Sequence, residues 1–193
     1  MQTLKKSTLE TLGYQDVNHH VIDRCKSGDN RAQYELYKLY SKAMFNVCMR
    51  ITNDYAEAQD VLQEAFVSAF KNLHSYKAEA SFGSWLKKIV VNAAINAIRK
   101  RRAELVPLDE RLVSDIADDL QEDNSEWQVE KVRRAIQQLP DGYRVVLSLY
   151  LLEGYDHAEI GEVLGITEST SKSQYSRAKK KLLEIMREPQ FAV

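Results

Sequence analysis

The sequence predicts an all-α protein made of two helical domains. The 193 residues include only three prolines and seven glycines, so few residues interrupt helices. Apolar residues recur every three or four positions over long stretches, and no segment alternates apolar and polar residues as a half-buried strand does. With 44% hydrophobic and 28% charged residues the chain resembles ordinary globular proteins, and we expect one or two packed cores.

Four helices are expected in the first half of the chain. A short helix over residues 17–26 should stop at a Ser-Gly pair, and a polar residue at 29 or 30 can cap a longer helix that ends near Thr52. The third helix should begin near residues 53–54. It carries a broad apolar face that contains Val61, Leu62, Ala65, Phe66, Ala69, Phe70 and Leu73.

The fourth helix should run from about Ser81 into four consecutive cations at 99–102. Favourable interaction with the helix dipole explains one or two cations in a last turn, and four suggest a further use. The arc predicted to be buried contains Leu86, Ile89, Val90, Ala93, Ala94 and Ala97. The opposite arc contains Lys88, Asn92, Asn96 and Arg99. Cations and amides on one face suit a nucleic acid with exposed bases.

Trp85 projects toward this polar arc, where its ring could stack on a base. A core or domain-boundary aromatic explains Trp85 equally well, so both interpretations stay open.

An acidic segment separates two basic ones. Residues 103–126 hold nine Asp or Glu and a single basic residue, whereas residues 85–102 hold six Lys or Arg and no acid. Like charges repel and apolar residues are few, so the acidic segment is predicted to be a flexible linker. We therefore expect domains over 17–102 and 127–187, although the net charge of −1 hides this division.

The second domain is predicted to contain a helix-turn-helix. Helices are expected over 127–138, 140–153, 156–164 and 167–187, with a capping box from Asp156 and Glu159 and a tight turn at Gly165. A short helix, a glycine turn and a helix with a basic outer side are typical of a unit that enters the DNA major groove. A solvated face on an amphipathic helix is the commoner use of such a pattern.

The last helix separates into two faces at helical spacing. Ser171, Tyr175, Ala178, Leu182 and Ile185 fall on the inner side. Thr170, Ser173, Gln174, Arg177, Lys180 and Lys181 fall on the outer side, and Lys172 is a further basic candidate. Arg can bridge guanine, Gln can bridge adenine, and Lys or Ser can hold phosphate, so the outer side is a candidate reading face.

Several other classes of function are not indicated. Cys25 and Cys48 lack metal-ligand spacing and are interpreted as reduced, cytosolic thiols. His19 and His20 would point about 100° apart on a helix, so they should not share a metal. No metal or cofactor is expected. The N-terminus turns polar early and no run of 18 apolar residues occurs, which predicts neither a signal peptide nor a membrane span.

The order of motifs resembles a known family. The chain contains DVLQEAFVSAFKNLHSY, then SFGSWLKKIVVNAAINAIRKRR, an acidic spacer, and LPDGYRVVLSLYLLEGYDHAEIGEVLGITESTSKSQYSRAKKKL. Over residues 21–186 it resembles bacterial sigma factors of the extracytoplasmic-function (ECF) group. The resemblance implies two domains, sigma-2 and sigma-4, that bind core RNA polymerase and recognise minus-ten and minus-thirty-five promoter elements. It also implies a cytoplasmic protein that is not itself an enzyme, with an anti-sigma factor as a further candidate partner.

The resemblance also implies roles for single residues. Asp60, Gln63 and Glu64 fall in the segment that docks the polymerase, although exposed acids on an amphipathic helix are the plain alternative; Phe66 is expected in the core. The loop over 76–81 matches one that captures a flipped minus-ten base. The minus-ten candidates are Tyr76, Lys77, Ser81, Trp85, Lys88, Asn92, Asn96 and Arg99. The minus-thirty-five candidates are Thr170, Lys172, Ser173, Gln174, Arg177 and Lys180.

Ser171 departs from the family pattern, where an apolar residue, often Val, is usual early in this helix. A small hydroxyl there could loosen the packing or bond locally to the backbone.

Two other functions compete with this one. A stand-alone helix-turn-helix regulator would use the same second domain but would have no need for the polymerase motif in the first. An enzyme with a metal held by the carboxylates of residues 115–123 would require a rigid oxygen cage, and that segment lacks turn glycines.

Overall fold

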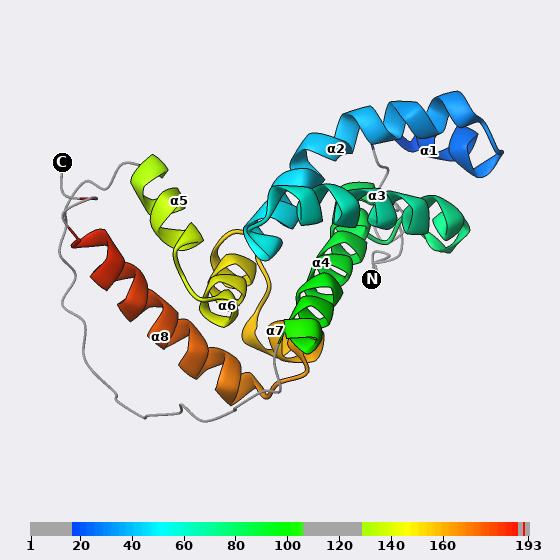
Figure 1. Ribbon diagram of the computed structural model, residues 1–193. Coiled ribbons are helices and arrows are strands. Elements are labelled where there is room, and N and C mark those ends of the chain that lie inside the picture. The colour runs from blue at the N-terminus through cyan, green and yellow to red at the C-terminus, as the bar shows by residue number, and fades with distance from the viewer. Residues whose placement is uncertain (1–16, 106–128, 189–190, 192–193) are drawn as a thin grey trace, which may run out of the picture. The chain divides into compact units, whose positions relative to one another are not determined.

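The computed structural model describes residues 17–105, 129–188 and 191 (Figure 1). Within these residues the regular elements are all helical, which confirms the all-α prediction. They are α1 (His19–Lys26), α2 (Asn30–Thr52), α3 (Tyr55–Lys71), the short 3-10 helix η1 (Leu73–Ser75), α4 (Phe82–Leu105), α5 (Val129–Gln137), α6 (Asp141–Leu151), α7 (His157–Leu164) and α8 (Glu168–Met186). Apart from its first three residues, the acidic linker predicted over 103–126 lies outside the described residues, and so does the carboxylate segment 115–123.

The described residues form two compact units whose boundary falls inside helices. The first unit takes the chain up to Met49 together with Asp54–Ala94. The second takes Arg50–Asn53 and the chain from Ile95 onward. Helices α2 and α4 therefore each contribute to both units. The domain limits of 17–102 and 127–187 stay a prediction from the sequence.

The first unit is built around the apolar face of α3. Asp54 caps this helix by accepting a hydrogen bond from the Glu57 backbone N–H at 2.8 Å. The buried residues of the helix are Ala58, Val61, Leu62, Ala65, Phe66 and Ala69. The Phe66 ring is 3% exposed and packs edge-on against Tyr37, with ring centroids 4.9 Å apart. Phe66 is therefore a core residue, as expected.

The second unit is organised along α8, which packs against α5, α6 and α7 (Figure 1). Its buried cluster consists of Ala135, Ile136, Leu139, Leu147, Ala178, Ile185, Met186 and Phe191. No helix in the described part of the chain is long and apolar enough to span a membrane. No three His, Cys, Asp or Glu side chains gather as metal ligands among the described residues.

Both cysteines are free and buried in the first unit. Burial raises the pKa of the Cys25 thiol to about 11 and that of the Cys48 thiol to about 12. Because the thiolate is the reactive form, alkylation by iodoacetamide at pH 8 should be slower in the native protein than in urea by on the order of a hundredfold. Mass spectrometry of timed samples measures this ratio. Equal rates in the two conditions would contradict the burial of both thiols.

Candidate nucleic-acid interface

Helix α4 presents a row of polar side chains at four-residue spacing. Lys88, Asn92 and Asn96 are all exposed, and the spacing places them on one face of the helix. Asn96 Oδ1 accepts a 3.5 Å hydrogen bond from Arg99 Nη1 in the next turn. Each exposed amide offers one donor and one acceptor group, so the row can pair with base edges while Lys88 holds a phosphate.

The buried side of α4 differs in part from the prediction. Leu86, Val90 and Ala94 are buried as expected, but Ile89, Ala93 and Ala97 are only half-buried. Three residues outside the predicted arc are buried instead: Val91, Ile95 and Ile98. Burying Val91, Ile95 and Ile98 removes more apolar area from water than burying Ile89, Ala93 and Ala97 would, so the buried side of the helix is shifted toward these three residues.

Trp85 belongs to an aromatic group at the start of α4. Its ring is half-buried and lies 5.5 Å from the rings of both Tyr76 and Phe82. Tyr76 is only 4% exposed, so its ring face is covered. Of the aromatic residues proposed to meet DNA, Trp85 is therefore the one whose ring reaches the surface.

The loop over 76–81 connects η1 to α4 and has hydrogen bonds at both ends. The Tyr76 hydroxyl donates a hydrogen bond to the Ala80 carbonyl oxygen at 2.8 Å. Ser81 caps α4 because its Oγ accepts from the Ser84 backbone N–H at 3.1 Å. The side chain of Lys77 is exposed between these ends.

A second polar face lies on α3, opposite its buried side. Asp60, Gln63 and Glu64 are exposed, and Val67 beside them is 52% exposed. Gln63, Glu64 and Val67 follow Asp60 by three, four and seven residues, so the four side chains form one continuous strip on the helix surface. An acidic strip with an apolar residue at one end is a suitable surface for a basic protein partner.

The helix-turn-helix is present over α7 and α8. The Asp156 side chain accepts from the Glu159 backbone N–H at 2.8 Å and the Glu159 side chain accepts from the Asp156 N–H at 2.9 Å, which confirms the capping box. Gly165 ends α7 with φ +68°, a left-handed conformation that favours glycine. Thr167 then caps α8 by accepting from the Thr170 N–H at 3.0 Å.

The two faces of α8 follow the predicted division in part. Ser171, Ala178 and Ile185 are buried, and Tyr175 and Leu182 are half-buried. On the outer side Ser173 and Lys181 are exposed, as is Lys172, whereas Thr170, Gln174, Arg177 and Lys180 are half-buried. Lys172 pairs with Glu168 at 2.6 Å, and Thr170 Oγ1 shares a 2.8 Å hydrogen bond with Thr167 Oγ1.

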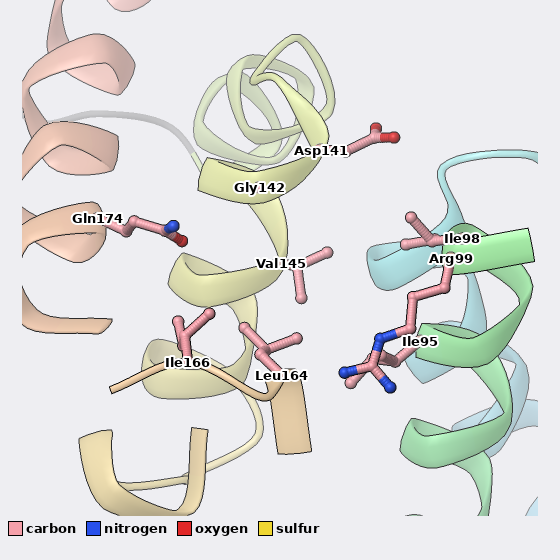
Figure 2. Close-up of a pocket in the computed structure, with 9 residues that line it drawn as sticks. All are labelled: Ile95, Ile98, Arg99, Asp141, Gly142, Val145, Leu164, Ile166 and Gln174. Atoms are coloured by element: carbon pink, nitrogen blue, oxygen red, sulfur yellow. The ribbon is translucent and has the colours of Figure 1, made fainter. Parts of the chain in front are cut away.

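One pocket of the second unit brings two candidate residues together. Arg99 and Gln174 both line it, with Val145, Leu164 and Ile166 (Figure 2). The Arg99 guanidinium extends toward Leu164 and donates a hydrogen bond from Nη2 to the Val163 carbonyl oxygen at 3.1 Å.

Two family descriptions match this chain. Sigma-70 region 2 matches residues 36–104, and sigma-70 region 4 matches residues 129–182. The chain is 30% identical over 149 residues to the ECF RNA polymerase sigma factor SigM of Bacillus subtilis, covering 77% of this chain and 91% of SigM. The chain belongs to the ECF RNA polymerase sigma factor family.

Other members of the sigma factor family extend the similarity over more of the chain. SigW of Bacillus subtilis is 28% identical over 179 residues, which cover 86% of this chain and 95% of SigW. The RNA polymerase sigma-H factor of Pseudomonas aeruginosa is 29% identical over 178 residues, 86% of this chain and 91% of that protein. This sigma factor therefore acts in promoter-directed transcription initiation. Neither of the two matched family descriptions is that of an enzyme family.

Solved structures share the fold of this sigma factor. The structure of CnrH in complex with the cytosolic domain of CnrY has a TM-score of 0.53 at 22% identity and covers 89% of this chain and 97% of that one. RpoE of Bartonella quintana, solved with the anti-sigma factor NepR, has a TM-score of 0.54 at 20% identity and covers 81% of this chain and 97% of that one.

The structure explains the unusual Ser171 in region 4 of this sigma factor. Ser171 is 0% exposed, and its Oγ shares a 2.9 Å hydrogen bond with His157 Nδ1 at the start of α7. The His157 ring stacks on Tyr150 at 4.5 Å and lies edge-on to Tyr175 at 5.6 Å. A buried hydroxyl without a partner would cost about 1–3 kcal/mol, and His157 removes that cost. The hydroxyl thus bonds between helices and not to its local backbone.

Gly161 is a sterically constrained position in this sigma factor that the sequence patterns did not reveal. A Cβ built on Gly161 would lie 2.8 Å from the Ile166 carbonyl oxygen and 3.5 Å from the Glu168 backbone N. The Gly161 carbonyl oxygen also accepts from the Ile166 N–H at 3.0 Å. The turn between α7 and α8 therefore packs directly on this glycine. A glycine inside a short helix was the available signal.

Proposed function

We propose that this sigma factor binds core RNA polymerase and recognises both promoter elements, the minus-ten element through α4 with the loop 76–81 and the minus-thirty-five element through α8. The observation that carries the proposal is the exposed row of Lys88, Asn92 and Asn96 within the part that matches sigma-70 region 2. A stand-alone helix-turn-helix regulator would have no use for that row or for a region 2 match.

The proposed minus-ten surface has different side chains for the bases and for the phosphates of a melted strand. Asn92 and Asn96 can donate to and accept from base edges, and Lys88 can hold a phosphate. Trp85 is half-buried and precedes Lys88 by three residues on the same helix, so its ring is the candidate for stacking on a base. Tyr76, whose ring is covered, shapes the loop in this proposal and does not stack on a base. Lys77 and Ser81 are the remaining loop candidates.

Replacing Asn92 by alanine should reduce promoter opening and leave polymerase binding intact. Asn92 is fully on the surface of α4, so the change empties no core, and an amide that pairs only with an unstacked base matters once melting begins. Permanganate footprinting of unpaired thymines measures the bubble. Asn46→Ala on the exposed side of α2 is a matched control. If Asn92→Ala opens as many thymines as the wild type, Asn92 does not contact the melted strand.

The minus-thirty-five surface is proposed to combine base reading with phosphate contacts. Thr170, Lys172 and Ser173 lie in the first turns of α8, followed by Gln174, Arg177 and Lys180. Arg177→Ala should cost about 1–3 kcal/mol at one base pair and flatten preference there, whereas Lys180→Ala should weaken all sequences alike.

Holoenzyme carrying each of these variants can be tested on promoters with a randomised upstream element. The salt slope of binding should fall by about one contact for Lys180→Ala only. A uniform loss from Arg177→Ala with unchanged preference would make Arg177 a phosphate contact and leave Gln174 and Ser173 as the base-reading candidates.

The polymerase surface is proposed to be the strip of Asp60, Gln63 and Glu64 on α3, because it is acidic and exposed and it ends in the apolar Val67. Polymerase works on chromosomal DNA, so the proposed place of action is the cytoplasm. RpoE of Bartonella quintana was solved with an anti-sigma factor. We propose a partner of that kind here as well.

Transcription with purified core polymerase on a random promoter library tests the function as a whole. The expected result is a set of start sites that share one minus-ten and one minus-thirty-five sequence and that require the added protein. Tight sequence-specific binding of duplex DNA by the protein alone, with no start sites in the presence of polymerase, would favour the stand-alone regulator.

A further inference from the structure

We infer that Lys26, the last residue of α1, is a positioning residue that holds the loop 76–81 in one conformation and thereby sets the base preference at the minus-ten position that this loop receives. The inference rests on the proposed function. Lys26 precedes the region 2 match, which begins at residue 36, and no promoter or polymerase role is assigned to it above.

The first observation is the contact between Lys26 and the loop. Lys26 Nζ donates a 2.9 Å hydrogen bond to the Tyr76 carbonyl oxygen and lies 5.5 Å from the centroid of the Tyr76 ring. The stem of α1 is fixed in the core by Val21, Ile22 and Cys25, all buried. The ammonium group is therefore held from a rigid helix that is 50 residues away in the sequence.

The second observation is that Tyr76 transmits this contact to both ends of the loop. Its backbone N–H donates to the Leu73 carbonyl oxygen at 3.1 Å, and its hydroxyl donates to the Ala80 carbonyl oxygen at 2.8 Å. Its ring packs edge-on against Phe82 at 5.5 Å. One buried side chain thus closes the loop into a ring and joins it to the first turn of α4.

The third observation is the backbone between these ends. Ala78 has φ +58°, in the left-handed region that non-glycine residues seldom adopt. Such a conformation persists where surrounding contacts hold it. Here the hydrogen bonds to the carbonyl oxygens of Tyr76 and Ala80 fix the backbone on both sides of Ala78. Lys77 and Glu79 project outward from this fixed backbone.

A loop that is ordered before DNA binds loses less conformational entropy on binding and discriminates more strongly among the four bases. Without the ammonium group the Tyr76 carbonyl would lose its charged donor and the ring would lose its cation. The loop would then sample other conformations, while the α4 amide row and α8 would be unchanged. The predicted effect is therefore confined to one promoter position.

The test compares holoenzymes on a promoter library randomised across the minus-ten element. Lys26→Met keeps most of the unbranched side chain and removes the ammonium donor. Tyr76→Phe keeps the ring and removes the hydroxyl that bonds to Ala80. Each should reduce preference by about tenfold at the same single minus-ten position, with unchanged core affinity and minus-thirty-five preference. Lys26→Arg retains a donor and should restore most of the preference.

Lys38→Met is the matched control, because Lys38 also lies 5.5 Å from a tyrosine ring, that of Tyr34, and both residues are exposed on α2. The inference is overturned if Lys26→Met leaves preference unchanged or lowers transcription equally at every promoter. If Lys26→Met fails to fold, as seen by circular dichroism, Lys26→Ala decides by the same criterion, because alanine also removes the donor to the Tyr76 carbonyl and is a good helix former. Failure of the proposed function is a different result, since wild-type protein would then yield no start sites.

Discussion

Reversing the charge of both Asp60 and Glu64 to arginine should abolish binding to core RNA polymerase and leave the helix content unchanged. The two carboxylates are exposed one turn apart on α3, and the buried side of that helix is formed by other residues. Reversal therefore places two cations on the proposed docking surface without emptying the core. A like-charge contact across an interface is repulsive, and we expect affinity to fall by on the order of a hundredfold or more.

Binding can be measured by size-exclusion chromatography and by competition against the wild-type sigma factor for limiting polymerase. Reversal of Asp23 on α1 and Glu162 on α7, two exposed acids elsewhere, changes the net charge equally and serves as the control. If the double variant of Asp60 and Glu64 binds polymerase with wild-type affinity, this strip is not part of the polymerase interface. Equal loss in the control would point to a nonspecific effect of net charge.

Gly161→Ala should destabilise the helix-turn-helix and weaken use of the minus-thirty-five element. The added methyl group would lie 2.8 Å from the Ile166 carbonyl oxygen, a backbone atom of the turn that carries α8. Alanine favours a helix over glycine by about 1 kcal/mol, but overpacking costs about 1–3 kcal/mol and, against backbone, should exceed that gain. The net effect should displace or loosen α8 relative to α7.

Gly142→Ala on α6 provides a closely matched control, because nothing lies within 4 Å of a Cβ built there. It should be neutral or slightly stabilising, since alanine is the better helix former. Urea unfolding followed by circular dichroism gives the two midpoints, and promoter-library transcription gives the dependence on each element. Identical midpoints for the two variants would show that the turn can move away from Gly161 at no cost.

Local sequence patterns determined the helices and much of the candidate surface of this protein. The capping box at Asp156 and Glu159 and the glycine turn at Gly165 located the helix-turn-helix, because caps and turns depend on residues a few positions apart. The four-residue spacing of Asn92 and Asn96 likewise located an exposed polar row on α4. Hydrophobic periodicity is a property of a single helix, so it can be read from the sequence.

Only the tertiary structure decided which partners those helices meet. Periodicity left a choice between two neighbouring arcs of α4, and packing against other helices selected the arc with Val91 and Ile95.

Ser171 has a polar partner 14 residues away in His157, and the loop carbonyl of Tyr76 has one 50 residues away in Lys26. No local pattern encodes such pairs, because the energy of a hydrogen bond depends on the distance between two groups in space and not on their separation along the chain.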